Sequence, residues 1–216
     1  MSTKSDRRRQ VVGVDGSPGS KHALAWAVAR ADHLGPVEPV SAWHYPWWAF
    51  VPTGTNALVP LNEKEFDNVA RRLVDQSLEG IDRRQVLDAY VSHGSAGDAL
   101  VQAGETASLI VVGTRGHGSL TGSLLGSVSR HCVNHATVPV AVIPSESPVD
   151  DRFGAVVVGY DRSENAERAI EWAIENSPPA TEIRVVHVWS PSSTATAQTA
   201  AMAFDLLSAE SLDLVR

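Results

Sequence analysis

Five glycines gathered in the middle of the chain mark the segment with the clearest chemical potential. They follow the apolar run SLIVV and are Gly113, Gly116, Gly118, Gly122 and Gly126. Glycine reaches backbone angles that other residues avoid, and successive N–H groups in such a turn can surround an anion. Ser127 then begins a helical pattern and suits its N-cap, so the positive end of the helix dipole would favour a phosphate. The segment predicts a phosphate-binding loop, with a surface loop of small residues as the alternative.

Two side chains of this loop, Arg115 and His117, could add positive charge at the phosphates or could simply face solvent. The sequence contains no Gly-Lys pair, which excludes the Walker phosphate loop. The stretch GVDGSPGS at 13–20 lacks the Gly-x-Gly-x-x-Gly spacing of dinucleotide-binding folds, and the Asp15 carboxylate would repel a pyrophosphate. An ionised aspartate only accepts hydrogen bonds, so Asp15 suits ribose hydroxyls or an adenine amino group. We therefore expect Asp15 near a nucleoside and residues 113–127 near its phosphates.

Strands that alternate with helical patterns must position these two segments. Strands are predicted at 9–15, 37–45, 86–92, 108–113 and 138–144, and helices at 20–35, 62–82, 96–105 and 127–136. The uninterrupted apolar runs LIVVG and VPVAVIP are typical of central parallel strands buried on both faces. The pattern predicts an open α/β fold with a parallel sheet, whose ligands bind beyond the carboxyl ends of the strands. Both glycine-rich segments follow a strand at that edge.

The end of the chain repeats its beginning. At an offset of 146, residues 11–43 match residues 157–189 without a gap and are identical at ten of 33 positions. The identities include Gly13/Gly159, Asp15/Asp161, Ser17/Ser163, Ala23/Ala169, Trp26/Trp172, Ala27/Ala173 and Trp43/Trp189. A gapless match of this length indicates domain duplication, with convergent strand-helix-strand patterning as the alternative.

The repeat suggests how the chain is organised. We expect a polar tail at 1–9, a complete domain at 10–144, a linker at 145–154 and a partial second domain at 155–216. The partial copy contains a strand, a helix, a second strand and at most part of a further helix. We expect it to dock on the first domain or on a second chain; a poorly folded tail is the alternative.

Three separated segments resemble the universal stress protein family. Gly113-x2-Gly116-x9-Gly126-Ser127 matches the nucleotide motif of its ATP-binding members. VVGVDGSPGSKHALAWA is similar to the family's first strand and helix, and GSVSRHCVNHATVPVAVIP to its last helix and strand. The resemblance implies a five-stranded parallel sheet of order 3-2-1-4-5, a Rossmann-like arrangement related to the adenine nucleotide α-hydrolases, and a partial second copy.

The resemblance also implies a ligand and its contacts. The ligand is ATP, with or without Mg²⁺, and we expect one per chain because the second copy has YDRSENAE in place of the Gly-Ser-Pro turn. The nucleoside would lie by Gly13, Val14, Asp15 and Trp43. The phosphates would lie by Gly113, Thr114, Arg115, Gly116, His117, Gly118, Gly126, Ser127 and Val128.

The function implied is that of a non-catalytic regulator of stress or dormancy, at most with slow incidental ATP hydrolysis. Expected partners are ATP, a second copy in a homodimer or an intramolecular pseudo-dimer, and an unidentified protein. An interaction module without nucleotide and an enzyme of the related α-hydrolase group are the alternatives. No Gly-x-Ser-x-Gly elbow and no carboxylate pair placed for acid–base chemistry is visible, which disfavours the enzyme.

Composition limits the expected partners and compartment. The net charge of −7 and the pI of about 5.6 do not indicate the basic surface that binds nucleic acid. The sequence has no run of eighteen apolar residues and no apolar segment behind its basic start, so we expect neither a membrane span nor a secretory signal. A single cysteine fits a reducing cytoplasm.

Several other residues carry possible chemistry. His131 and His135 are spaced to ligate a metal or to complement a helix C-terminus. Cys132 is interpreted as a core side chain rather than a nucleophile. The aromatic stretch Trp47-Trp48 with Phe50 either packs a long loop or marks a partner site. Phosphorylation at Ser119, Ser123 or Ser129 is left open.

Overall fold

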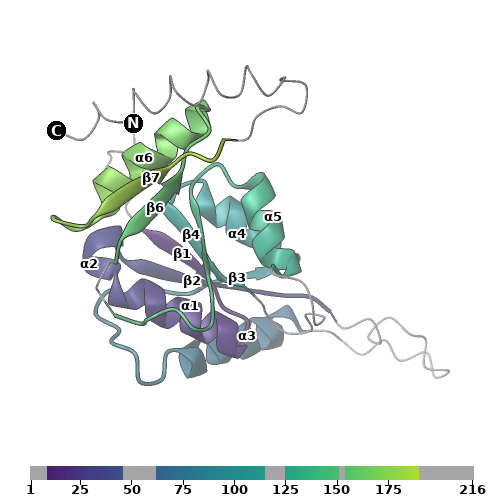
Figure 1. Cartoon of the computed structure of the whole chain (residues 1–216). Helices are drawn as coiled ribbons and strands as arrows, with labels where there is room; N and C mark the ends of the chain where they lie inside the picture. The colour runs from purple at the N-terminus through teal and green to yellow at the C-terminus, as the bar shows by residue number, and fades with distance from the viewer. Residues whose placement is uncertain (1–8, 46–61, 115–124, 151–153, 190–216) are drawn as a thin grey trace, which may run out of the picture. The chain divides into compact units, whose positions relative to one another are not determined.

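The computed structural model describes residues 9–45, 62–114, 125–150 and 154–189 (Figure 1). The chain divides into two compact units, Met1–Arg152 (unit 1) and Phe153–Arg216 (unit 2). Among the described residues, no helix is long and apolar enough to cross a membrane.

Unit 1 is built on a five-stranded sheet of order β3-β2-β1-β4-β5, in which every neighbouring pair is parallel. The strands are β1 (Gln10–Gly13), β2 (Val37–Trp43), β3 (Tyr90–His93), β4 (Leu109–Gly113) and β5 (Val140–Ile143). Parallel strands require crossover connections, and helices supply them. The predicted fold class and strand order are confirmed.

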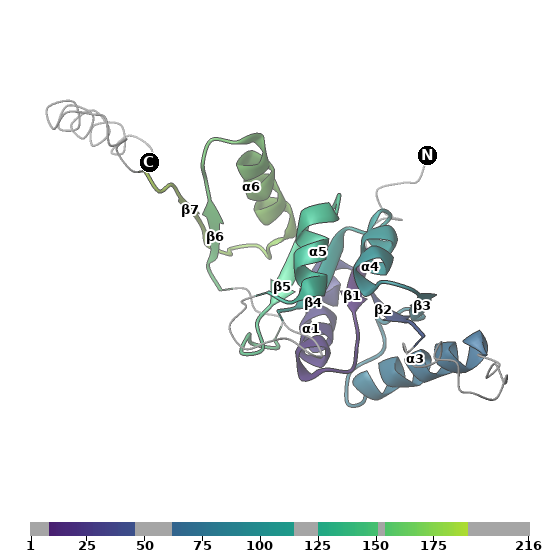
Figure 2. The same ribbon diagram turned by 90° about the vertical axis from the view of Figure 1, so that its right-hand side faces the viewer.

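The described part of unit 1 contains five helices. They are α1 (Pro18–Ala29), α2 (Ala31–Leu34), α3 (Glu63–Ser77), α4 (Ala96–Gly104) and α5 (Ser127–His135). Helices α1 and α3 lie on one face of the sheet and α4 and α5 on the other, as the two views show (Figures 1 and 2). The central strands are therefore covered on both faces, and Val11, Val12, Ile110 and Val111 are all fully buried.

Helix and strand ends differ from the sequence prediction in places. The expected helix at 20–35 begins earlier, because Ser17 caps it through a 3.2 Å bond from the N–H of Ser20 to its Oγ and Pro18 fits the first position. It breaks at Arg30, whose ψ of 10° lies outside the helical range. The third strand, expected at 86–92, is shorter and is observed as β3 at Tyr90–His93. At its predicted start, Val86 forms only an isolated bridge with Val37. Local pattern fixes where an element lies, whereas its ends depend on caps and neighbours.

Unit 2 contains a parallel pair of strands, β6 (Val156–Gly159) and β7 (Ile183–Val186), joined by α6 (Glu164–Asn176). Its geometry follows that of β1, α1 and β2. The N–H of Val156 bonds to the carbonyl of Glu182 at 2.8 Å, and the equivalent bond in unit 1 joins Gln10 to Pro36 at 2.8 Å. Ser163 caps α6 as Ser17 caps α1. The two copies therefore share strand register and helix capping as well as sequence.

Candidate functional site

The two glycine-rich segments touch at the carboxyl edge of the sheet in unit 1. A side-chain carbon added to Gly113, the last residue of β4, would lie 2.8 Å from the carbonyl oxygen of Gly19 in the first turn of α1. Only glycine permits this approach, since the neighbour is backbone and cannot rotate away. The end of β4 and the turn after β1 thus form one continuous backbone surface.

The loop after β4 is closed at its base. Thr114 donates its N–H to the carbonyl of Ile143 at 3.1 Å, and the carbonyl of Thr114 accepts from the N–H of Gly126 at 2.7 Å. The predicted site residues Arg115, Gly116, His117 and Gly118 lie outside the described residues, as do Ser119 and Ser123. The described geometry fixes where this segment leaves the sheet and where it returns.

Helix α5 begins with N–H groups that no described side chain caps. Gly126 is its N-cap and Ser127 its first helical residue, so our placement of Ser127 at the N-cap was wrong by one position. The bond from the N–H of Arg130 to the carbonyl of Gly126, at 3.1 Å, starts the helical pattern. Helices α1, α3, α4 and α6 are instead capped by Ser17, Asn62, Ser95 and Ser163.

The start of α5 is chemically suited to an anion. The first N–H groups of a helix have no acceptor within it, and the dipole makes this end positive. At α5 these groups belong to Ser127 and Val128. Ser129 is buried, and its hydroxyl donates to the carbonyl of Gly126 at 3.0 Å, so it leaves the N–H groups uncapped. That burial also removes Ser129 from the exposed phosphorylation candidates.

Asp15 already has a local role. Its Oδ1 accepts from the N–H of Ser17 at 3.0 Å, and its own N–H faces the hydroxyl of Ser20 at 3.3 Å. In unit 2 the Oδ1 of Asp161 accepts from the N–H of Ser163 at 2.9 Å. Because both copies make this bond, it is a property of the turn between strand and helix. Asp15 is nevertheless exposed at the carboxyl edge.

The neighbouring residues of this turn are held by packing. Val14 is buried, and its N–H bonds to the carbonyl of Val40 at 2.8 Å, so its side chain faces the interior. Gly13 faces Leu100 of α4, which a new side-chain carbon would approach to 3.1 Å. Gly16 has a φ of +79° and lies under Leu73 of α3. The turn after β1 is thereby fixed from both faces of the sheet.

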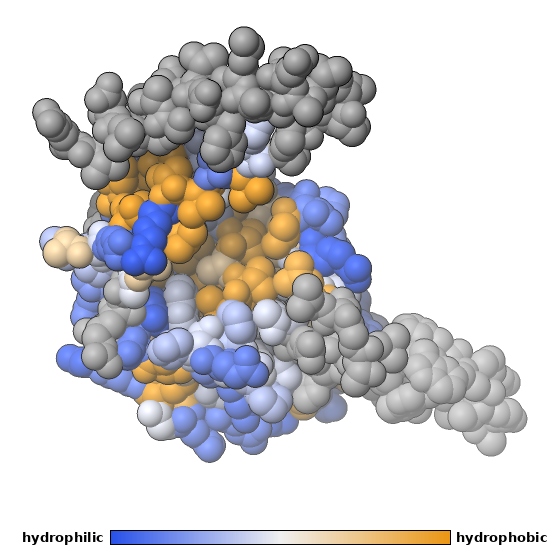
Figure 3. Space-filling model, viewed as in Figure 1, coloured by the Kyte–Doolittle hydropathy of each residue, from blue (hydrophilic) through white to orange (hydrophobic). Residues whose placement is uncertain are grey.

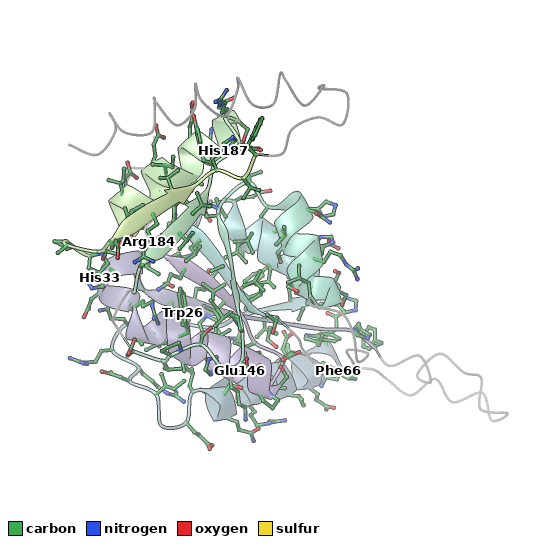
Figure 4. All side chains as sticks on the ribbon, viewed as in Figure 1. Trp26, His33, Phe66, Glu146, Arg184 and His187 are labelled. Atoms are coloured by element: carbon green, nitrogen blue, oxygen red, sulfur yellow. The ribbon has the colours of Figure 1, made fainter. Side chains whose placement is uncertain are left out.

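Trp43 belongs to an aromatic cluster that the sequence did not predict. Its indole N–H donates to Asp67 at 2.7 Å, and its ring stacks on Phe66 with centroids 4.9 Å apart. Tyr45 and His93 pack against the same indole, at 5.3 and 4.7 Å (Figure 4 labels Phe66). No pattern in the sequence indicates that α3 meets the end of β2. Trp47, Trp48 and Phe50 lie outside the described residues.

The cysteine and the two histidines singled out in the sequence are buried or bonded to other parts of the protein. Cys132 is fully buried, and this desolvation raises the pKa of its thiol to about 11, so it stays neutral and unreactive. His131 lies 3.0 Å from Asp98, and His135 bonds to the carbonyl of His131 at 2.8 Å. In the described part of the chain, no group of three or more His, Cys, Asp or Glu side chains is arranged to hold a metal.

Comparison with known proteins gives a consistent result. The model of the universal stress protein family matches residues 7–144 and 152–214. The chain is 32% identical over 209 residues to universal stress protein Rv1996 of Mycobacterium tuberculosis, covering 88% of this chain and 65% of the relative. It is 33% identical over 199 residues to universal stress protein Rv2005c of the same organism, covering 88% of this chain and 67% of that protein. The chain therefore spans about two thirds of the length of these relatives.

A solved structure agrees in fold. The crystal structure of a universal stress protein from Archaeoglobus fulgidus covers 94% of this chain and 73% of its own length. It superposes with a TM-score of 0.63 at 21% sequence identity. Similarity at this level concerns the arrangement of the backbone.

Proposed function

The chain belongs to the universal stress protein family, and from this premise we propose that unit 1 binds one ATP at the carboxyl edge of its sheet and acts as a regulator. The observation that carries the proposal is the uncapped first turn of α5. It lies directly after the closed base of the glycine-rich loop, which itself leaves the sheet where Gly113 meets Gly19. Backbone N–H groups at a helix start form a ready-made binding site for a phosphate.

The residues present fit a nucleotide of this kind. The N–H groups of Ser127 and Val128 would face the phosphates, and the turn at Asp15 would face the nucleoside. When bound, ATP, with or without Mg²⁺, would supply a triphosphate whose hydrolysis state could be read by a partner. The N–H groups and the turn named here would bind and orient it without moving a proton.

We propose a regulatory rather than an enzymatic role. The Cys132 thiol is buried and neutral, and the described site offers backbone donors in place of a general base. Regulation would then proceed through altered association with a second copy or with another protein. A cytoplasmic setting and a role in stress or dormancy belong to the same proposal.

The direct test is to denature freshly purified protein by heat and to identify released nucleotide by chromatography. We expect ATP at close to one equivalent per chain. Native mass spectrometry should show one nucleotide bound, and two would contradict the assignment to unit 1 alone.

A charge variant locates the site. Ser127→Asp places a carboxylate at the start of α5, where the dipole tolerates it and a phosphate does not. We expect at least a tenfold loss of ATP affinity by calorimetry with no loss of stability. Asn134→Asp adds the same charge to the last turn of the same helix and should leave affinity within twofold. Equal effects of both variants would contradict a phosphate site at the start of α5.

A second candidate, an interaction module without nucleotide, is favoured by one observation. The Asp15 carboxylate and the indole N–H of Trp43 already form hydrogen bonds within the protein. If neither released nucleotide nor ATP binding is found, this candidate replaces the first.

A further inference from the structure

Unit 2 exposes a face that its counterpart in unit 1 buries. Val157 of β6 is 61% exposed, whereas the equivalent Val11 is fully buried. Val186 of β7 is 44% exposed, whereas the equivalent Val40 is only 2% exposed. Val188, two residues beyond, is 86% exposed. We call Val157, Val186 and Val188 the bare face. Arg184, which lies opposite Val157 in the strand pairing, shares this face and is ion-paired with Glu182 at 2.7 Å. Apolar residues over β6 and β7 are visible in Figure 3.

The same chain shows what normally lies on such a face. In unit 1, Val11 and Val40 belong to a core cluster with Leu100 of α4 and Cys132 of α5. Helix α6 occupies the opposite face of the small sheet, where Val158, Ala166 and Ala173 are buried. Among the described residues of unit 2, nothing plays the part of α4 or α5.

The edge of β6 is also open. Strand β1 pairs with β2 on one side and β4 on the other, whereas β6 pairs within the described residues only with β7. The N–H groups of Val156 and Tyr160 donate to the side of β7. Because N–H directions alternate along a strand, those of Val157 and Gly159 point to the open edge.

Strand β6 is short, at four residues, but none of these residues is charged or a proline. Natural edge strands are shielded by charges, proline or bulges. The edge strand β5 is flanked by Pro139 and Pro144, but β6 reads VVVG and matches the central strand β1, which reads QVVG, at three of four positions. An interior type of strand therefore stands at the edge of a sheet.

We propose that the open edge of β6 and the bare face form an acceptor site for an extended apolar segment of a partner polypeptide. The segment adds as a strand parallel to β6, as β4 does to β1. A symmetric contact with a second copy fits less well, because stable interfaces bury about 800 Å² per partner and the bare face offers only three valines. Strand addition gains main-chain hydrogen bonds that a flat contact lacks.

The pairing of β1 with β4 defines the chemistry of the partner segment. Gln10, Val11 and Val12 lie opposite Leu109, Ile110 and Val111. The partner segment should therefore be uncharged, rich in β-branched residues and at least four residues long, with apolar side chains on the bare face.

The test uses the full chain and a fluorescent peptide of residues 106–114 with a lysine tail for solubility. Anisotropy should show saturable binding of one peptide per chain. By hydrogen–deuterium exchange, the amides of Val157 and Gly159 should become protected, while those of Val156, Val158 and Tyr160 should change little because they already face β7.

Matched peptides probe the edge without altering the protein. In unit 1 the N–H of Ile110 bonds to the carbonyl of Pro139, so the N–H of Val111 points the other way, toward β1. Methylating the peptide nitrogen at Val111 should weaken binding at least tenfold. Methylating it at Ile110 should weaken it less than threefold.

Matched protein variants probe the bare face. Val157→Lys should weaken binding at least tenfold, whereas Val69→Lys, at a valine of α3 that is 53% exposed, should leave it unchanged. The proposal is overturned if no peptide binds, or if Val157→Lys and methylation at Val111 both have no effect. It is also overturned if Val157 and Gly159 are protected without peptide: protection that rises with protein concentration would identify a second copy as the occupant, and constant protection the chain itself.

Discussion

Units 1 and 2 begin with the same β-α-β arrangement but surround it differently. The turn after the first strand is held by an aspartate in both, and the following helix is capped by a serine in both. The bond between the second strand and the residue after the first is 2.8 Å in each copy. Yet positions that are buried in unit 1 are exposed in unit 2. Short-range chemistry sets the local geometry, whereas the burial of an apolar side chain depends on the elements around it.

The largest difference should appear at a contact that the described part of unit 2 lacks. Gly113→Ala places a carbon 2.8 Å from the carbonyl oxygen of Gly19, which the backbone must move to accommodate. We expect a loss of about 3 kcal/mol in the free energy of unfolding of unit 1. Hydrogen exchange within each unit measures this, and unit 2 should be unaffected. Gly154→Ala, which meets nothing within 4 Å, is the control.

The matched valines should differ next most. Val11→Ala empties a fully buried position and should lower the stability of unit 1 by about 2 kcal/mol. Val157→Ala acts at a position that is 61% exposed and should change unit 2 by less than about 0.5 kcal/mol. Urea unfolding followed by exchange within each unit separates the two. A large cost at Val157 would mean that something covers it in solution.

The matched glycines test the same contrast with added rather than removed volume. Gly13→Ala brings a carbon to 3.1 Å from Leu100 and should cost about 1 kcal/mol. Gly159→Ala meets nothing within 4 Å and should be neutral or stabilise by about 0.5 kcal/mol, since it restricts the unfolded chain. The same exchange measurement applies, and equal costs would show that the two environments are alike.

Removing the helix cap should cost the same in both units, because the cap is a local interaction that both units share. Ser17→Ala and Ser163→Ala each remove one bond to an N–H in the first turn, of 3.2 Å in both cases. Each should cost about 1 kcal/mol in its own unit. Thermal unfolding with exchange readout compares them. A cap effect confined to unit 1 would refute the view that local geometry is independent of burial.

The smallest of these effects should be the loss of stability of unit 2 at low pH. Hydrogen bonds from Ser163, its side chain first and then its backbone, hold the pKa of Asp161 below the ordinary value. The resulting stabilisation is present above the unfolded-state pKa and is lost as the pH falls through the folded-state pKa. Unit 2 should therefore lose a small part of its stability below about pH 4. Asp161→Asn should flatten this loss in circular dichroism melts, and a steeper loss in the variant would contradict the assignment.

The sequence predicted what depends on short-range pattern. Buried runs such as LIVVG identified the central strands, and the position of the glycines after β1 and β4 placed both segments at one edge of the sheet. It missed the partners of Trp43, because Phe66, Asp67 and His93 come from two other elements and only the crossovers bring them together. The N-cap of α5 lies one residue earlier than predicted, because Gly126, with extended backbone angles, takes the cap position that a serine would favour. Side-chain contacts between different elements leave no periodic pattern in the sequence, so they could not be predicted from it.

The 2.7 Å bond between Gly126 and Thr114 has a consequence for how this protein could be altered. It joins the two described ends of the glycine-rich loop directly to each other. Closing a longer connection costs little entropy, since doubling its length adds only about 0.6 kcal/mol. If this loop binds a nucleotide as we propose, replacing the sequence between these two residues should change ligand preference without redesign of the sheet.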